Sequence, residues 1–368
     1  MQAYMAQGEQ RAYALDNRGP VRYTDAGNIH PDIIAKYWQY GFYVFESVFG
    51  AHELDDLEVA FRDILARLPS ERGSLLDAQG RAALGVGCEA PILFWSKPLG
   101  DPFGGTDQAN GRHPVKMTEP TPAADAPAEV VYLLLGTLQF SDALLRTYGH
   151  ADLLAVAAAV NGDDFVPFNE AMFIKAPGLG ASVAWHQDGI THWDSPNWDQ
   201  GSHGFNFMGQ LYGCTPANGV WVVPGSHKLG KVDIAARVAA AGSERLPDAV
   251  PMVCAPGDVV ISNRQLVHGS FANTSKDWRV TINMGFHRRA SVLDVHGGGL
   301  HAAPAIYDAA HIRQRARIIG YAIDARSKRF SHETPFVYKP HLEAGETYCW
   351  DAAAKAMMHD YNLLDMSI

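Results

Sequence analysis

Hydrophobic and polar positions divide the chain into a largely helical first part and a second part made of short strands. Apolar residues recur at helical spacing over 53–68 and again over 141–160, which predicts two amphipathic helices. A shorter helix is expected over 30–40, and Gly41 separates it from a predicted strand over 42–45. Residues up to about 160 therefore form a predicted helical flank.

From about residue 163 to residue 290, short apolar runs alternate with Gly, Pro and Asn. Such runs predict strands, and many short antiparallel strands in one half of a chain are typical of a sandwich or a jelly roll. We expect a mainly β fold with flanking helices, in which this part is the jelly-roll core. Six strands are predicted, over 165–175, 183–188, 205–212, 220–223, 258–262 and 279–286.

Residues 70–128 have little periodicity and contain Gly-rich and Pro-rich stretches. A long irregular segment of this kind is either an ordered lid or a disordered excursion. Its aromatic and charged residues, such as Trp95 and His113, favour a lid. We therefore expect one domain over 1–368, with residues 291–368 as a C-terminal extension to which the sequence assigns no role.

Composition narrows the function classes. The formal charge is -10 over 368 residues, and the basic residues form no run, so a nucleic-acid partner is not expected. The N-terminus is polar and no long apolar run follows, so we expect neither a membrane partner nor export, but a cytoplasmic location. The four cysteines are widely separated, which indicates neither a zinc ribbon nor a disulfide framework, and the sequence does not determine the oligomeric state.

The candidate chemistry begins with His186 and Asp188, which flank Gln187 at the end of a predicted strand. Residues two apart on a strand point to the same side, and another strand can bring His268 to a third corner. Two imidazoles and one carboxylate on one face leave coordination positions open, which suits Fe(II) oxygenases rather than a closed structural zinc site. We predict that His186, Asp188 and His268 bind iron and are the catalytic centre.

Arg279 and Ser270 follow His268 in the sequence. A 2-oxo acid that chelates iron needs a cation deeper in the barrel for its distal carboxylate, and a guanidinium provides a permanently charged, two-pronged donor. Arg279 suits this role, with the Ser270 hydroxyl as a second donor. The alternative is that Arg279 pairs with a surface acid.

The chain resembles the phytanoyl-CoA dioxygenase family of Fe(II)/2-oxoglutarate oxygenases over about residues 165–288. The resemblance rests on the order and spacing of several motifs. It implies a double-stranded β-helix, a cupin-like jelly roll, in which His186, Asp188 and His268 bind iron. It also implies that Arg279 and Ser270 bind 2-oxoglutarate. The motifs are Trp185-His186-Gln187-Asp188, Asn218-Gly219, Val223-Pro224-Gly225-Ser226-His227-Lys228, Pro256-Gly257-Asp258, His268-Gly269-Ser270 and Arg279.

The resemblance implies a reaction with O₂ as co-substrate, in which 2-oxoglutarate is converted to succinate and CO₂ and a nearby C–H bond is oxidised. Family members that halogenate replace the metal-binding carboxylate by a small residue, whereas Asp188 is retained here. We expect hydroxylation, or a related oxidation such as desaturation or ring formation. The rival hypotheses are a catalytically silent metal-binding jelly roll and a zinc hydrolase.

The expected substrate is a small-molecule metabolite, which the sequence does not identify. The family acts on acyl-CoA thioesters, amino acids and secondary metabolites, and the low basic content gives no support for CoA in particular. We expect an aromatic-walled pocket above the iron. The candidate substrate contacts are Trp193, Asn206, Lys175 and Trp95, and Gln210 is a further candidate for 2-oxoglutarate.

Overall fold

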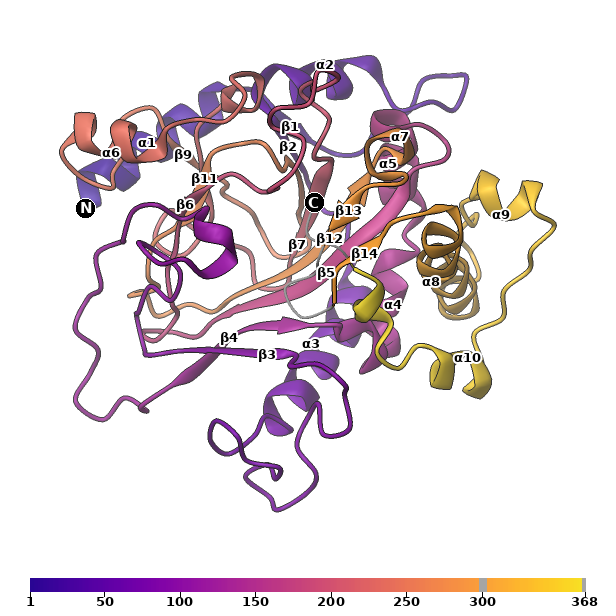
Figure 1. Ribbon diagram of the computed structural model, residues 1–368, viewed down its shortest axis with the longest axis horizontal. Helices are drawn as coiled ribbons and strands as arrows, with labels where there is room; N and C mark the ends of the chain where they lie inside the picture. Colours follow the sequence, from indigo (N-terminus) through magenta and orange to yellow (C-terminus); the bar gives the residue numbers. More distant parts are fainter. Residues whose placement is uncertain (298–302, 366–368) are drawn as a thin grey trace.

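A computed structural model of the chain describes residues 1–297 and 303–365. Two sheets face each other and enclose a barrel, with helices packed around them (Figure 1). This arrangement confirms the predicted jelly roll with flanking helices. The larger sheet has the order β1-β2-β10-β7-β12-β5-β4-β3, and the smaller has the order β6-β11-β8-β9.

All six predicted strands are present, and the third metal-ligand candidate lies on a further short strand, β11. The strands of the larger sheet are β1 (Arg18–Gly19), β2 (Phe42–Phe45), β3 (Leu93–Ser96), β4 (Val130–Leu135), β5 (Val166–Lys175), β7 (Phe205–Gln210), β10 (Val259–Asn263) and β12 (Arg279–His287). Those of the smaller sheet are β6 (Val183–His186), β8 (Trp221–Val222), β9 (Val250–Pro251) and β11 (His268–Ser270), and β13 (His296–Gly297) pairs separately with β14 (Ala305–Ile306).

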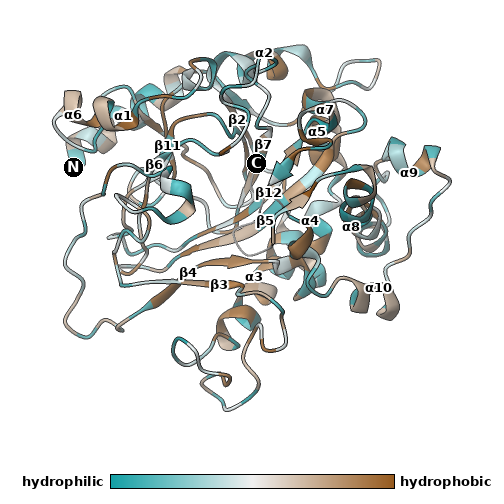
Figure 2. Cartoon of the chain, in the orientation of Figure 1, coloured by the Kyte–Doolittle hydropathy of each residue, from teal (hydrophilic) through white to brown (hydrophobic). Residues whose placement is uncertain are grey.

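The larger sheet separates the helical core from the barrel interior. Alternate residues of β12 point to opposite faces, as the period of a strand requires. Val280, Ile282 and Met284 belong to the core beneath the helices, whereas the residues between them line an internal pocket. In Figure 2 the strands β3 and β4 are mostly hydrophobic, while α8 has many hydrophilic residues.

Two groups of helices pack around the sheets. Figure 1 shows α3, α4 and α8 beside the long strands β5 and β12, and α1 and α6 near β6, β9 and β11. Their bounds are α1 (Gln2–Ala14), α2 (Pro31–Tyr40), α3 (Ala51–Ala66), α4 (Asp142–Tyr148), α5 (Ala151–Asn161), α6 (Ile234–Ala241), α7 (Arg289–Val292), α8 (Ala309–Arg329), α9 (Lys339–Glu343) and α10 (Ala352–Met357).

The single helix predicted over 141–160 is wrong, because the structure contains two helices, α4 and α5, that are separated at Gly149. A Cβ atom at Gly149 would lie 2.4 Å from backbone atoms of Ala322 in α8. The chain therefore passes very close to α8 at this point, and the hydrophobic period of the sequence continues across a break that tertiary packing imposes.

The predicted lid segment, 70–128, is mainly irregular but contains β3 and one short 3₁₀ helix, η1 (Gln108–Gly111). The Asp101 carboxylate accepts hydrogen bonds from the backbone N–H groups of Gly104 and Met117, which holds residues 101–117 in a compact loop. The backbone N–H of Ser182 donates to the carbonyl oxygen of Gly100 at 2.8 Å, so the loop is also attached to the barrel.

In the described ranges, no helix combines the length and the apolar character required to cross a bilayer. The described part of the C-terminal extension adds the long helix α8, the short helices α9 and α10, and a 3₁₀ turn, η4 (Tyr361–Leu364). The cysteines are all free thiols.

Candidate metal centre

The fold brings His186, Asp188 and His268 together. His186 ends β6 and pairs directly with His268 on the neighbouring antiparallel strand β11, while Asp188 lies two residues beyond His186. One donor atom from each residue lies within 4.8 Å of the other two, and all three side chains are buried. The Asp188 carboxylate oxygens are 3.5 Å from Nε2 of His186 and 3.9 Å from Nε2 of His268. These donors are close enough to contact one ion.

Backbone hydrogen bonds orient both imidazoles for a metal. Nδ1 of His186 lies 2.8 Å from the carbonyl oxygen of Ala184, and Nδ1 of His268 lies 2.9 Å from that of Leu266. A carbonyl oxygen only accepts, so each Nδ1 carries the proton and each Nε2 presents a lone pair toward Asp188. Burial, with His186 nearby, lowers the pKa of His268 to about 4, which keeps this ring neutral at physiological pH. The residues therefore fit a divalent ion.

Asp188 is surrounded by positive and hydrogen-bonding groups. Nη1 of Arg112 lies 3.3 Å from one carboxylate oxygen, and Nε of Arg264 lies 3.7 Å from the other, to which the Asn206 amide also donates. Burial acts to raise the pKa of Asp188, but Arg112, His186 and the other neighbours hold it well below its usual value. The carboxylate is therefore ionised and ready to bind a cation.

Arg279 lies in the same pocket and points into it from β12. The residue is only 2% exposed, and its guanidinium makes no hydrogen bond or ion pair with any residue within 1–297 or 303–365. Burial lowers the pKa of Arg279 to about 10, so the group still carries its charge at neutral pH. A buried charge without a partner is costly, so this geometry fits an anionic ligand rather than the alternative of a surface ion pair.

Ser270 lines the pocket together with Arg279, whereas Lys175, a candidate substrate contact from the sequence, does not line it. Lys175 pairs with Arg279 across β5 and β12, and its buried amino group donates to the Ser270 hydroxyl at 2.8 Å and to the carbonyl oxygen of Phe271. Burial and the adjacent Arg279 lower the pKa of Lys175 well below its usual value. This end of the barrel therefore combines the charge of Arg279 with the donor groups of Ser270 and Lys175, as a carboxylate of a 2-oxo acid requires.

The remainder of the pocket is largely apolar, with amides at one place. Asn169, Asn206 and Asn283 come from β5, β7 and β12, and a Cβ at Gly285 would meet the amide oxygens of Asn169 and Asn206. Because the Asn206 NH₂ group faces the Asp188 carboxylate, its oxygen faces away, and that oxygen and the Asn169 oxygen have no partner in the described chain. The apolar walls are formed by Phe103, Ala109, Leu133, Leu135, Ala171, Phe173, Val183, Met208 and Val220.

The lid segment contributes directly to this pocket. The buried ring of His113 lies against His186, with ring centroids 4.2 Å apart, and stacks on Phe103 at 5.1 Å. Burial, His186 and Arg112 together lower the pKa of His113 far below its usual value, so this imidazole is neutral. The loop therefore covers the metal-ligand candidates with one aromatic pair and one arginine.

Some substrate and 2-oxoglutarate contacts predicted from the sequence do not line the pocket. Trp95 is on the edge strand β3 and does not line the pocket, and Trp193 lines a neighbouring hollow beside Arg112, where its indole N–H donates to the carbonyl oxygen of Gly189. Gln210 accepts a hydrogen bond from the hydroxyl of Thr281, and Thr281 rather than Gln210 lines the pocket. Of these candidates, Asn206 is the one that both lines the pocket and touches a metal-ligand candidate.

Several residues that line the pocket were not predicted from the sequence. Thr281 and Asn283 follow Arg279 at intervals of two on β12, so the alternation of that strand contains the signal that would have found them. Asn169 follows the same rule on β5. Arg112 and His113 have no such signal, because they belong to an irregular loop whose path depends on long-range contacts.

Several solved structures are similar in fold at low sequence identity. EctD from S. alaskensis, solved with 2-oxoglutarate and 5-hydroxyectoine, is 20% identical, with a TM-score of 0.48 over 74% of this chain and 81% of that chain. The non-heme alpha ketoglutarate dependent epimerase SnoN from nogalamycin biosynthesis is 16% identical, with a TM-score of 0.45 over 70% of this chain and 80% of that chain. EvdMO1 is 23% identical with a TM-score of 0.45, and the match covers 69% of this chain but only 49% of EvdMO1.

None of the curated proteins matches the chain in sequence. The model of the phytanoyl-CoA dioxygenase (PhyH) family does match, over residues 37–281, which is more than half of the 368 residues. The matched range contains the three metal-ligand candidates, Ser270 and Arg279. The chain belongs to the phytanoyl-CoA dioxygenase family.

Proposed function

We propose that this protein hydroxylates an unactivated C–H bond of a small-molecule metabolite and releases succinate and CO₂. The family gives the broader class, a non-haem iron oxygenase with Fe(II), 2-oxoglutarate and O₂ as cofactor and co-substrates. In this proposal His186, Asp188 and His268 bind the iron, and Arg279 with Ser270 binds the distal carboxylate of 2-oxoglutarate. When bound, the iron would activate O₂ at the expense of the 2-oxo acid.

One observation carries the proposal: a buried, unpartnered guanidinium lies in the same pocket as a His-Asp-His cluster. A zinc hydrolase would use the same three ligands, but it would also need a general base and would have no use for Arg279. His113 is the other imidazole in the pocket lining, and its strongly lowered pKa makes it a poor base. A catalytically silent metal-binding jelly roll would not require the positive charge of Arg279 in the same pocket as the metal-ligand candidates.

Retention of Asp188 favours oxygen transfer over halogenation. The carboxylate occupies the position that a halide would need on the metal, and Arg264 and Asn206 hold it from the side. Hydroxylation is therefore the reaction that we propose, while epimerisation and carbocycle formation are activities of structurally similar proteins.

The pocket favours a compact substrate with an apolar skeleton that also bears hydroxyl groups. Leu133, Leu135 and Phe173 supply apolar contacts, while the uncommitted amide oxygens of Asn169 and Asn206 can accept hydrogen bonds from a substrate hydroxyl. A substrate that left these buried oxygens without donors would bind less tightly. An acyl-CoA thioester is a poorer match, because its phosphates would need several cations, and the described lining of the pocket contains Arg112 and Arg279 but no lysine.

A metabolite panel tests the proposed function. The protein is incubated with Fe(II), 2-oxoglutarate, O₂ and one compound at a time, and succinate release is measured. We expect hydroxylated terpenoid-like or polyketide-like compounds to stimulate succinate release severalfold and to gain one oxygen atom. If no iron-dependent succinate release is detected, either with any compound or without an added compound, the proposal is contradicted.

The position of His113 in the lid segment leads to a second prediction, which concerns closure of the site. Replacing His113 by Ala should raise succinate release in the absence of any other substrate severalfold, because the ring that covers His186 would be lost and water would enter the site. The matched control is Gln108→Ala, which changes an exposed residue of the same loop. Equal substrate-free succinate release in the His113 and Gln108 variants would show that His113 does not close the site.

A further inference from the structure

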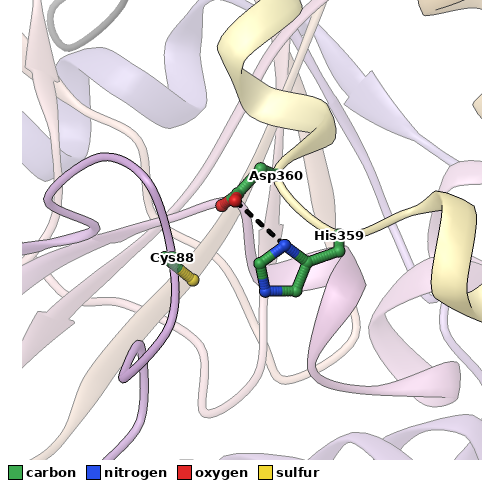
Figure 3. A group of neighbouring side chains, drawn as sticks. All are labelled: Cys88, His359 and Asp360. Carbon is green, nitrogen blue, oxygen red and sulfur yellow. Dashed lines mark ion pairs between the residues drawn. The ribbon is translucent and has the colours of Figure 1, made fainter.

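A second cluster of metal-binding side chains lies outside the active-site pocket. Cys88 belongs to the loop that follows α3, whereas His359 and Asp360 lie between α10 and η4 near the C-terminus. The three side chains point toward one another from two different segments (Figure 3). One donor atom from each lies within 4.8 Å of the other two. Cys88 and Asp360 are half-buried, and His359 is exposed.

The fold holds the carboxylate in place for this contact. Asp360 has a left-handed backbone conformation with φ of 56°, which is uncommon for a residue other than Gly. Its backbone N–H donates to the side-chain oxygen of Gln139 at 3.0 Å, and its carboxylate accepts from the backbone N–H of Glu89 at 3.1 Å. His359 Nδ1 lies 2.9 Å from the same carboxylate oxygen. The adjacency of His359 and Asp360 in sequence explains their pairing, but only the tertiary fold brings Cys88 to them.

We propose that Cys88, His359 and Asp360 bind a zinc ion. Thiolate, imidazole and carboxylate are the three donor types that proteins use for zinc, and a thiolate donor disfavours the hard cations Mg²⁺ and Ca²⁺. Three protein ligands leave one tetrahedral position for water. A pocket lined by His359, Asp360, Met357 and Tyr321 adjoins the cluster and would give that position access to solvent.

Zinc binding at this site releases one proton. Burial, together with Asp360, raises the pKa of the Cys88 thiol to about 11, so without metal the sulfur stays protonated at neutral pH. The thiol proton passes to solvent as the Zn–S bond forms, and no oxidant or reductant is involved. The bound ion relieves the unfavourable approach of a thiolate to a carboxylate, because both anions then contact the same cation.

The ion would connect two segments that pack against the back of the barrel. Tyr361, the residue after Asp360, donates its hydroxyl to the buried Glu170 of β5 at 2.5 Å. Glu170 lies between Asn169 and Ala171, which line the active-site pocket from the other face of the strand. A metal at Cys88 would therefore fix the C-terminal turn that supports this strand.

Cobalt substitution tests the site without any activity measurement. Co²⁺ bound by a thiolate has an intense sulfur-to-metal charge-transfer absorption, and the active-site candidates His186, Asp188 and His268 contain no sulfur. We expect metal-free protein titrated with Co²⁺ to develop this absorption to one equivalent per chain at Cys88. Added Zn²⁺ should then abolish it. The absorption should be absent in Cys88→Ser and unchanged in Cys349→Ser, which alters the exposed cysteine.

Further variants keep the result independent of folding and of the active site. His359→Ala should weaken cobalt binding at least about tenfold, because it removes one of three ligands. The His186→Ala/Asp188→Ala protein should retain the absorption, so failure of the proposed oxygenase function would not affect this test. In the His186→Ala/Asp188→Ala background, which removes the other metal-binding cluster, Zn²⁺ should also raise the Tm, and this rise should be lost when Cys88→Ser is added. No thiolate absorption, or an absorption that survives in Cys88→Ser, would overturn the proposal.

Discussion

Replacing Asp188 by Ala should abolish iron-dependent succinate formation. The variant loses the carboxylate that faces Nε2 of both His186 and His268, so the ion would keep only two protein ligands. Partners that merely orient a metal ligand already contribute about 10- to 100-fold in metal affinity or activity, and loss of a direct ligand should cost at least the upper end of that range. We therefore expect less than about one hundredth of the wild-type rate, measured as succinate released at saturating 2-oxoglutarate.

Stability has to be followed in the same variant, because Arg112 and Arg264 lose their shared anion. Asp188→Asn keeps the shape of the side chain and should also be inactive, since an amide is a much weaker ligand than a carboxylate. Asp194→Ala, which removes an exposed acid from the following loop, is the matched control and should keep full activity. If Asp188→Ala releases succinate at the wild-type rate, Asp188 is not a metal ligand.

Replacing Arg279 by Ala should raise the 2-oxoglutarate concentration for half-maximal activity by about 10- to 100-fold. A hydrogen bond to a charged group contributes about 1.5–3 kcal/mol, and each 1.4 kcal/mol corresponds to a factor of ten. The rate at saturating 2-oxoglutarate should change much less, because the guanidinium would hold the co-substrate away from the reacting atoms. Arg279→Lys should fall between the two proteins, since an ammonium lacks the two-pronged geometry of a guanidinium.

Thermal unfolding distinguishes this binding role from a structural one. Arg279 has no partner among the described residues, so its removal relieves an unpaired buried charge, and we expect little loss of stability. Arg326 is the matched control, because it is also buried but pairs with Glu53 and Glu333. Arg326→Ala should destabilise the fold by about 3–5 kcal/mol. An unchanged 2-oxoglutarate requirement in Arg279→Ala would refute its role.

The sequence contains enough information to predict the barrel and two of its three metal-ligand candidates, because both depend on the two-residue period of strands. His186 and Asp188 share a side for that reason, and Arg279 points inward with Thr281 and Asn283 on the same strand. The association of His268 with His186 depends on strand pairing, which the family motifs indicate and local patterns do not. The fold and the cluster of three candidates could thus be predicted.

Features that depend on packing between distant segments could not be predicted. The break at Gly149 results from its contact with Ala322, which lies far along the chain. Arg112 and His113 reach the metal-ligand candidates through a loop held by Asp101 and by Ser182, and no periodic pattern encodes that path. Aromatic character alone pointed to Trp95 and Trp193, yet neither lines the pocket, because an aromatic residue can fill any apolar site.

We propose that a ferrous ion and 2-oxoglutarate bind together in the pocket that contains His186, Asp188, His268 and Arg279. The most direct test is anaerobic addition of Fe(II) and then 2-oxoglutarate to metal-free protein, followed by visible absorption. We expect a weak metal-to-ligand charge-transfer band that requires both components, is absent in Asp188→Ala, and needs more 2-oxoglutarate in Arg279→Ala. If the wild-type protein shows no such band and instead binds zinc tightly through His186, Asp188 and His268, joint binding of iron and 2-oxoglutarate is contradicted.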